Sequence, residues 1–319
     1  MTAPRIGLIG ARRSRQGLGP FVARWLVRAG AEVPCFSCTS EATASEADQD
    51  LRRIAGITAL GYADGARMIA EQKLDALAIL SPATTHRAWL ERALEAGLSV
   101  LCEKPFVWGA DDDLAATERL VRGFADRGLP LFENCQWPAT LPAFYELHPE
   151  GRDEPLRSFA MRLSPSRPGA NMLIDALSHP FSLLQALRPA EKMDVVAPRF
   201  STHDPAAEAL TLGFRYMADG EAVDVSVELT VGADSPREAS LAVNGRWAHR
   251  LIRTRDYALF FASNARVVDL PDPLALHLAR FVAALKYDPP RVSAAENTRI
   301  RQRMSALDLL GKAFVGSTS

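Results

Sequence analysis

Short apolar runs alternate with helix-like segments through the first part of this chain, and this alternation constrains the possible folds more than any other feature. Between the runs, apolar residues recur at helical spacing and the connections are short. Strands and helices that alternate in this way are typical of parallel βαβ units with right-handed crossovers. The sequence therefore predicts an α/β region with a doubly wound parallel sheet over residues 1–133. Its strands are expected at 5–10, 32–37, 57–61, 75–80, 98–102 and 129–133.

Two helices of this region carry apolar stripes. One stripe consists of Phe21, Val22, Trp25 and Leu26, and the other of Trp89, Leu90, Ala93 and Leu94. Gly97 follows the second stripe, where a glycine commonly ends a helix.

The pattern changes after Pro142. One helix is expected at 171–187, and alternating runs typical of antiparallel strands follow it, separated by turn sequences such as ADGE and NGRW. These runs lie at 208–216, 223–231, 238–244, 249–253 and 257–261. Two closing helices are striped by Leu274, Leu278, Phe281, Val282 and Leu285, and by Ile300, Met304, Leu307 and Leu310. We therefore predict a second, α+β domain over residues 134–319 with an antiparallel meander.

Length and composition agree with two globular domains. The chain has 319 residues, of which 48% are hydrophobic and 24% are charged. The formal net charge of -1 gives no indication of a nucleic-acid partner. No apolar run approaches the ~18 to 20 residues of a membrane span, and no signal-peptide pattern precedes the first strand. We expect a cytoplasmic protein that binds neither nucleic acid nor membrane.

The cysteines, at positions 35, 38, 102 and 135, are too few and too scattered for a disulfide framework. Cys35 and Cys38 form a C-x-x-C pair, which is also found in redox and metal sites. However, strand alternation would point the two side chains in different directions, and no second pair lies at a suitable spacing. We interpret them as buried apolar residues and expect no metal.

The first strand is followed by a loop rich in glycine and arginine, GARRSRQGLGPF. Small residues between a strand and a helix let backbone amides approach a pyrophosphate, and the helix N-terminus favours its charge. The glycine spacing differs from G-x-G-x-x-G, so a plain surface turn is an equal alternative. The candidate cofactor-binding residues are Gly10, Arg12, Arg13, Ser14, Arg15 and Gly17.

The end of the second strand lacks the acidic residue that would hold the ribose 2'-hydroxyl of NAD. Ser37, Thr39 and Ser40 lie there instead, and the nearest acid is Glu41. Hydroxyls and nearby guanidiniums suit a 2'-phosphate, which a carboxylate would repel. The sequence therefore predicts NADP as the preferred cofactor, with NAD possible. The alternative is that the arginines are solvated or hold only the pyrophosphate.

The segments SPATTH (81–86) and CEKP (102–105) follow consecutive strands, so both face one crevice at the carboxyl edge of the sheet. Pro105 favours an extended conformation at Lys104, which carries the charged pair into the crevice. A lysine at a strand end is otherwise commonly a surface residue. The candidate cofactor-binding residues here are Ser81, Pro82, Thr84, His86, Glu103 and Lys104.

A second group of polar residues lies in NMLIDALSHPF (171–181). Asp175 and His179 are spaced i, i+4, roughly opposite the apolar face of the expected helix. Such a pair is also common on solvated helix faces. Pro180 disfavours helical geometry at His179, so we expect the helix to kink or to restart there.

The segment SPATTHRAWLERALEAGLSVLCEKPF, followed by MLIDALSH, resembles the glucose-fructose oxidoreductase, inositol dehydrogenase and rhizopine-catabolism (Gfo/Idh/MocA) family. The resemblance implies a Rossmann domain, an open-faced antiparallel sheet, and reversible hydride transfer between NAD(P) and a carbinol of a sugar or cyclitol. It also implies that the catalytic residues are Lys104, Asp175 and His179.

These residue types fit that chemistry. His179 would take the hydroxyl proton, Lys104 would stabilise the developing alkoxide, and Asp175 would orient the sugar or the imidazole. Glu103 could hold the lysine or a ribose hydroxyl. Gln136 and Trp137, together with the catalytic residues, are the candidate substrate contacts. Gln136 and Trp137 stand where many relatives have Tyr or Arg, so the contacts with the substrate should differ from those in the relatives.

Other functions of the same fold stay open at this point. The alternatives are a dinucleotide-binding sensor without turnover, an imine reductase, and a lyase or glycosidase that uses transient oxidation. An antiparallel sheet with one face on its own helices leaves the other face to be covered, so we expect a homodimer or homotetramer packed through that sheet.

Overall fold

The structure is a computed structural model that describes residues 2–13, 17–232 and 236–316. The chain forms two compact units, each from two segments. Unit 1 consists of Met1–Asn134 and Leu274–Arg301, and unit 2 of Cys135–Pro273 and Gln302–Ser319. The expected boundary after residue 133 lies one residue before the end of the first segment. Residues 274–301, which were expected in the second domain, lie in unit 1.

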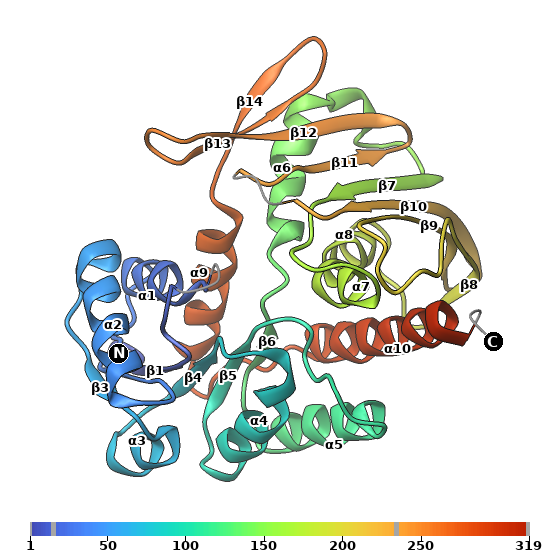
Figure 1. Cartoon of the computed structure of the whole chain (residues 1–319). Helices are drawn as coiled ribbons and strands as arrows, with labels where there is room; N and C mark the ends of the chain where they lie inside the picture. Colours follow the sequence, from blue (N-terminus) through green and yellow to red (C-terminus); the bar gives the residue numbers. More distant parts are fainter. Residues whose placement is uncertain (1, 14–16, 233–235, 317–319) are drawn as a thin grey trace. The chain divides into compact units, whose positions relative to one another are not determined.

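Unit 1 contains a six-stranded parallel sheet with the order β3-β2-β1-β4-β5-β6 (Figure 1). Each strand lies within or next to a run that the sequence predicted, so the doubly wound sheet is confirmed. The strands are β1 (Ile6–Ile9), β2 (Cys35–Ser37), β3 (Leu60–Tyr62), β4 (Ala76–Ile79), β5 (Ser99–Cys102) and β6 (Leu131–Glu133). The order reverses between β1 and β4, where open α/β sheets bind their ligands.

The helices of unit 1 are α1 (Gly19–Arg28), α2 (Glu41–Asp50), η2 (Leu51–Ala55), α3 (Gly65–Glu71), η3 (Ala83–Thr85), α4 (His86–Glu95), α5 (Asp113–Asp126) and α9 (Pro273–Leu285). Three of them, α1, α4 and α9, coincide with predicted apolar stripes, and no stripe was specified from the sequence for the others. Val22, Leu26, Leu90 and Ala93 are fully buried, as their spacing predicted. Gly97, with a φ of 70°, adopts the left-handed conformation that follows the end of α4.

The core of unit 1 includes side chains from the end of the chain. Leu278 and Phe281 of α9 are fully buried in the same cluster as Ile6 and Leu8 of β1. Phe281 also packs edge to face on Phe132 of β6, with ring centroids 5.4 Å apart. Burial of a side chain of this size contributes about 1.5–3 kcal/mol, so α9 is a substantial part of this core.

Unit 2 contains an eight-stranded sheet with the order β14-β13-β12-β11-β7-β10-β9-β8. Its strands are β7 (Ser158–Leu163), β8 (Met193–Phe200), β9 (Ala209–Ala218), β10 (Glu221–Thr230), β11 (Ala239–Val243), β12 (Arg246–Arg253), β13 (Ala258–Ala262) and β14 (Val267–Leu270). The mostly antiparallel sheet is confirmed. A simple meander is wrong, however, because β7 lies between β10 and β11 and pairs in parallel with β10 (Figure 1).

Three strands of this sheet escaped the sequence analysis, each for a physical reason. β14 has only four residues, β8 contains Pro198 and an irregular register between Val196 and Arg199, and β7 pairs only with strands that lie far away in the sequence. A proline removes a ladder hydrogen bond and interrupts the alternation that signals a strand.

One face of the sheet in unit 2 packs on helices. These are η4 (Trp137–Thr140), α6 (Leu141–Leu147), η5 (Pro149–Gly151), α7 (Ala170–Ala176), α8 (Ser178–Leu187) and the part of α10 (Ala294–Gly316) that lies in unit 2. Phe181 of α8 packs on Phe214 of β9, with ring centroids 5.5 Å apart. Alternate residues along β9 and β10 are buried on this face.

The single helix expected at 171–187 is interrupted. α7 ends at Ala176 and α8 starts at Ser178, so Pro180 is the third residue of a new helix. A proline in a first turn removes no intrahelical hydrogen bond, because that amide has no partner within the helix. The restart that Pro180 suggested is therefore confirmed, and it begins one residue before His179.

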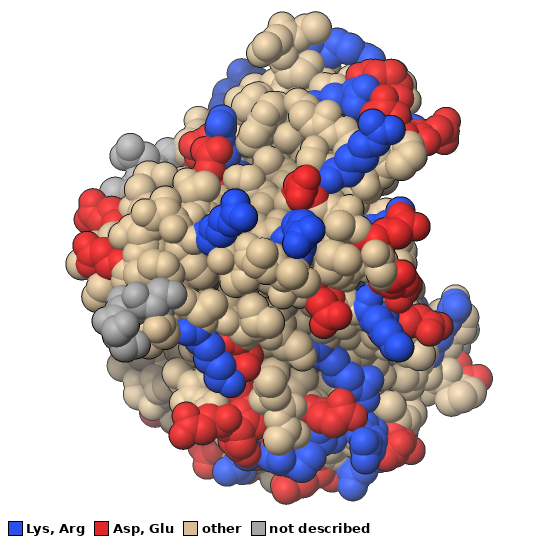
Figure 2. Space-filling view, turned by 90° about the vertical axis from the view of Figure 1, so that its right-hand side faces the viewer, with Lys and Arg blue, Asp and Glu red and all other residues tan. Residues whose placement is uncertain are grey.

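Charged side chains of both signs are interspersed on the face shown in Figure 2, in keeping with the formal net charge of -1. Within the described ranges, every helix is either too short or too polar to cross a lipid bilayer.

Candidate active site

The loop after β1 turns where Gly10 meets the backbone that follows β4. Gly10 has a φ of 86°, and a Cβ on it would lie 2.9 Å from the amide nitrogen of Ser81. A side chain is therefore excluded by both the conformation and the close approach. Gly19, the first residue of α1, is equally constrained, since its Cβ would meet the carbonyl oxygen of Ala11 at 2.2 Å. This close approach of backbone is what a pyrophosphate site at the start of α1 requires.

The two described arginines of this loop make contacts within unit 1. Arg12 forms an ion pair with Glu46 of α2. Arg13 donates to the carbonyl oxygen of Gly17 at 3.3 Å, and its guanidinium lies 4.9 Å from the ring centroid of Phe21. Ser14 and Arg15 lie outside the described residues.

The end of β2 places the predicted hydroxyls in different surroundings. Ser37 is buried, whereas Thr39 and Ser40 are exposed. The Ser40 hydroxyl caps α2 by accepting from the amide of Thr43 at 3.2 Å. The first acid is Glu41, which is already inside the helix.

The two cysteines near β2 are not poised for thiolate chemistry. Burial raises the pKa of Cys35 to about 11 and raises that of Cys38 from its ordinary value. Both are therefore thiols near neutral pH, which fits a packing role.

His86 connects the two loops that follow β4 and β5. Its ring nitrogens lie 2.8 Å from the carbonyl oxygens of Ser81 and Pro105, and the side chain is 1% exposed. Both nitrogens are thus occupied by backbone of the protein itself. In the same segment, the hydroxyls of Ser81 and Thr85 lie 2.6 Å apart. His86 therefore fixes the spacing between SPATTH and CEKP.

Glu103 and Lys104 leave β5 as a half-buried pair. The Glu103 carboxylate accepts a hydrogen bond from the side-chain amide of Asn134, which follows β6. Burial raises the pKa of Glu103, and the charge of Lys104 is the largest influence that opposes this rise. Pro82 and Thr84 lie in the neighbouring loop after β4, so the predicted residues of both loops meet at one edge of the sheet.

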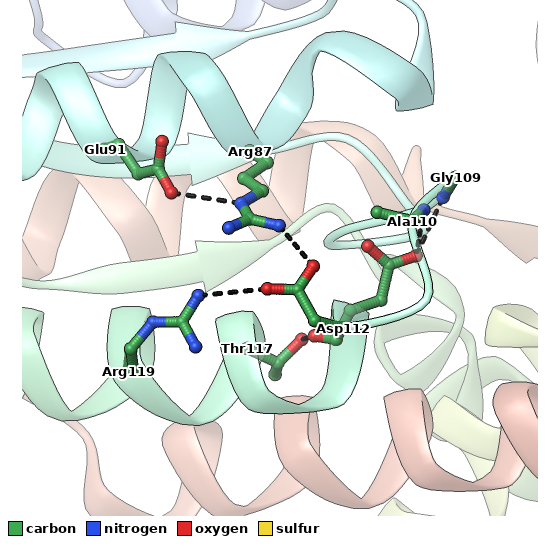
Figure 3. Close-up of polar contacts among 8 residues, drawn as sticks. Arg87, Glu91, Gly109, Ala110, Asp112, Thr117 and Arg119 are labelled. Carbon is green, nitrogen blue, oxygen red and sulfur yellow. Dashed lines mark hydrogen bonds and ion pairs between the residues drawn. The ribbon is translucent and has the colours of Figure 1, made fainter.

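Figure 3 shows how the continuation of the CEKP loop is tied to two helices. The Asp113 carboxylate accepts from the amides of Gly109 and Ala110 at 2.7 and 3.2 Å. Asp112 accepts from Arg87 of α4 at 2.6 Å and from Arg119 of α5 at 3.4 Å. The segment that follows Lys104 is therefore held by several polar contacts.

Unit 2 contains a pocket of about 150 Å³ that brings together the four predicted residues of this unit. Asp175 comes from α7, His179 from the first turn of α8, Trp137 from η4 and Gln136 from the residue before it. The helix restart explains the arrangement, because His179 lies in the first turn of α8 while Asp175 lies in the last turn of α7.

The side chains of the pocket are oriented by contacts within unit 2. Asp175 accepts from the amide and the hydroxyl of Ser166 at 3.0 and 3.1 Å. The rings of His179 and Trp137 lie 6.1 Å apart at 58°. The backbone carbonyl of His179 accepts from the Ser182 hydroxyl at 2.7 Å. An imidazole and an oriented carboxylate in one pocket can serve acid and base chemistry.

The sequence analysis missed three charged residues of this pocket, Arg237, Glu238 and Arg250. Arg237 and Glu238 precede β11, and Arg250 lies on β12. Arg250 pairs with Phe261 and lies on the same face of β12 as the buried Ala248. A charge at an inward position of an alternating strand was the signal that could have revealed it.

Comparison with known proteins gives matches to both the first part of the chain and the whole fold. Residues 5–134 match the sequence profile of the Gfo/Idh/MocA family, described as an oxidoreductase family with an NAD-binding Rossmann fold. A D-apiose dehydrogenase from Paraburkholderia graminis is 34% identical over 104 residues, which are 31% of this chain and 26% of that protein. A UDP-N-acetylglucosamine 3-dehydrogenase from Acidithiobacillus ferrooxidans is 30% identical over 128 residues, 39% of each chain. The chain thus spans well under half of these curated relatives.

Solved structures resemble the chain along nearly its whole length. A structure of the Acidithiobacillus ferrooxidans UDP-N-acetylglucosamine 3-dehydrogenase has a TM-score of 0.69 at 22% identity, covering 99% of this chain and 100% of that one. A 3-ketoreductase from Actinomadura kijaniata in complex with NADP has a TM-score of 0.67 at 20% identity, covering 96% of each chain. A protein of gentamicin A biosynthesis in complex with NAD has a TM-score of 0.70 at 15% identity, covering 100% of this chain and 96% of that one.

At these identities the structures establish a shared fold, and the family profile adds the NAD-binding Rossmann segment. Both agree with the glycine turn, the CEKP loop and the two-sheet architecture described above. Residues 5–134 therefore match the Gfo/Idh/MocA oxidoreductase family, and the whole chain shares its fold with a solved dehydrogenase and a solved ketoreductase.

Proposed function

We propose that the protein is an NAD(P)-dependent dehydrogenase or reductase that acts on a carbinol or carbonyl carbon of a sugar, a cyclitol or a related small molecule. The observation that carries this proposal is the pocket of unit 2, in which Asp175, His179, Gln136 and Trp137 lie together. Two curated relatives are named as a sugar dehydrogenase and a nucleotide-sugar dehydrogenase, which supports a sugar-like substrate.

Oxidation of a carbinol moves a hydride from carbon to the nicotinamide and a proton from the hydroxyl to a base. A neutral imidazole is suited to take that proton near neutral pH, and we assign this role to His179. Asp175, held by Ser166, orients the imidazole or a substrate hydroxyl. Lys104 stabilises the negative charge that develops on the oxygen, and polarises the carbonyl in the reverse direction.

We propose that the glycine turn at Gly10 and the loops held by His86 bind the cofactor, and that NADP is preferred over NAD. The exposed end of β2 carries Thr39 and Ser40 and lacks a carboxylate before Glu41. Arg12 is held by Glu46 in an exposed ion pair, which is worth at most about 1 kcal/mol. A doubly charged 2'-phosphate would compete effectively for that guanidinium.

We further propose a homodimer or homotetramer that packs through the sheet face opposite α7 and α8. This face carries Trp247 and His249, whose rings stack 5.9 Å apart, and Leu251, which is 47% exposed. Arg162 lies 4.4 Å over the Trp247 ring. Flat aromatic and aliphatic surface of this kind is typical of subunit contacts. A monomer in light scattering at micromolar concentrations would contradict the assembly.

The activity is tested by mixing the purified protein with NADP or NAD and panels of sugars, sugar acids, nucleotide sugars and cyclitols, and following nicotinamide absorbance. The reverse direction is tested with keto sugars and imines in the presence of NADPH. Turnover of a carbinol or keto sugar supports the proposal. Turnover of imines alone, or cofactor binding without any turnover, would assign the protein to one of the other functions of this fold.

A further inference from the structure

Arg250 is a cation on an apolar face of the sheet. Along β12 it follows the fully buried Ala248 on the face that packs on the helices, and its strand partner Phe261 is also fully buried. Its guanidinium lies 5.7 Å from the ring centroid of Trp137, and one of its terminal nitrogens donates to the carbonyl oxygen of Arg237 at 3.0 Å. Burial lowers the pKa of Arg250, which reflects the cost of removing a cation from water.

Arg237 places a second guanidinium on the same pocket. The Nε atoms of Arg237 and Arg250 are buried, and neither has a hydrogen-bond partner among the residues that the structure describes (2–13, 17–232 and 236–316). Within those ranges neither arginine forms an ion pair, in contrast to Arg162 and Arg246 of the same unit, which pair with Glu228 and Glu154.

Among the described residues, neither carboxylate of the pocket forms an ion pair with these two arginines. The Asp175 carboxylate is engaged by Ser166, and Glu238 is exposed at the rim. The imidazole side chain of His179 also lines the pocket. A guanidinium with unused N–H donors in a partly desolvated site is most stable opposite a planar or tetrahedral oxyanion, which it binds with two parallel hydrogen bonds.

We propose that Arg237 and Arg250 form an anion-binding subsite, so that the substrate carries a carboxylate or phosphate group in addition to its reacting carbon. This inference rests on the proposed function for the role of His179, and it narrows the substrate class to acidic or phosphorylated sugars and cyclitols. Trp137 contributes an apolar surface between the subsite and His179, against which a sugar ring can pack.

The test uses the full chain saturated with NADPH and measures the Kd of three matched probes by NMR titration. The probes are D-glucose, D-glucuronate and D-glucose 6-phosphate. We expect at least one anionic probe to bind about 10 to 100 times more tightly than D-glucose, the scale of one or two charge-assisted hydrogen bonds. A higher affinity for glucuronate than for the phosphate identifies a carboxylate substrate, and the reverse order identifies a phosphate. Equal affinity for all three probes would overturn the inference.

Variants separate this subsite from general attraction of anions. Arg250→Gln and Arg237→Gln should each raise the Kd of the anionic probe about tenfold. The Kd of D-glucose should stay within about twofold of the wild-type value. The control is Arg157→Gln, an exposed arginine of unit 2 that lines another pocket. An equal loss in the control, or equal weakening of glucose and anion, would show that the two arginines are not a subsite.

A stability measurement distinguishes binding from a structural role. If Arg250 is retained for a ligand, Arg250→Met should leave the Tm of the ligand-free protein unchanged or raise it, since a buried cation without an anion destabilises the fold. A fall of more than about 5 °C would assign Arg250 to the fold instead. These measurements need no turnover. The preference for anions can therefore be found even if the protein shows no dehydrogenase activity, and activity can be found even if the preference is absent.

Discussion

In unit 1 the candidate residues lie on loops at the carboxyl ends of parallel strands, whereas in unit 2 they are side chains that line a pocket between helices and one face of a mostly antiparallel sheet. The loops of unit 1 are held by contacts to backbone, as His86 shows with two carbonyl oxygens. The pocket of unit 2 depends on the register of β12 and on the break between α7 and α8.

This difference predicts how each region responds to mutation. Where the backbone forms most of the site, as in unit 1, most side chains can change, and the critical ones are Lys104, which takes part in the proposed chemistry, and those that hold the loops. Where side chains form the site, a single substitution removes a chemical group. The following predictions test that contrast.

The largest effect is expected for the residues that take part in the chemistry. His179→Ala and Lys104→Ala should each lower kcat/KM by at least about 100-fold, because a positioned base and a cation at the developing charge are lost. Cofactor affinity should be largely kept. Steady-state kinetics on an identified substrate and a cofactor titration measure both quantities.

Matched controls are His203→Gln and Lys192→Ala, two residues of unit 2 outside the pocket. The assignment of His179 and Lys104 is wrong if both alanine variants turn over like the controls.

A smaller effect is expected when the clamp between the unit 1 loops is removed. His86→Ala deletes the contacts of the ring nitrogens with two carbonyl oxygens, one of them buried, and should cost about 1–3 kcal/mol, seen as a Tm lower by roughly 3–8 °C. It should also weaken cofactor binding. Arg119→Ala breaks only an exposed contact to Asp112 and should change the stability by less than about 0.5 kcal/mol (Figure 3). Similar losses in the two variants would argue against a clamp.

The preference for NADP over NAD should depend on the side chain of Arg12, although most of the candidate cofactor site in unit 1 is formed by backbone. We expect wild-type protein to bind NADP more tightly than NAD, and Arg12→Ala to lower the NADP affinity about tenfold while NAD affinity is kept. Arg53→Ala, an exposed arginine on η2, is the control. Arg13→Ala and Arg15→Ala complete the set. Equal or tighter NAD binding in the wild type would refute the preference.

The smallest effect concerns the pH dependence of stability. Burial raises the pKa of Glu103 above its ordinary value of 4.5, so the folded state binds this proton more tightly than the unfolded state. The resulting destabilisation is absent below the ordinary value and develops as the pH rises through the raised folded value.

The Tm of Glu103→Gln relative to that of the wild type should therefore rise as the pH is raised from 4 to 8. Glu95→Gln, an exposed residue at the end of α4, should show no such trend. A pH-independent difference between Glu103→Gln and the wild type would mean that Lys104 and Asn134 fully compensate for the burial.

The two units also differ in how much of their structure could be predicted from the sequence. The parallel sheet and its loops were predictable because each functional segment directly follows an apolar strand. Asp175 and His179 were found through their i, i+4 spacing and the family resemblance, and Gln136 and Trp137 through the resemblance alone. Arg237 was not found, since its place in the pocket depends on the pairing of β11 with β7, which lies far away in the sequence. Arg250 was missed although its inward position on β12 was a local signal. The position of β7 was missed for the same reason as Arg237.

The contribution of α9 to the core of unit 1 has a consequence for synthesis of the chain. Leu278 and Phe281 complete the cluster around β1, yet they are made about 270 residues after it. A ribosome that has released only residues 1–134 therefore presents a parallel sheet with part of one apolar face uncovered. Unit 1 cannot finish folding until most of unit 2 has emerged, and unit 2 itself needs residues 302–319, so neither unit can be completed before the last part of the chain is made. Expression of residues 1–134 alone should accordingly yield an aggregation-prone fragment, and addition of a 274–301 peptide should improve its solubility.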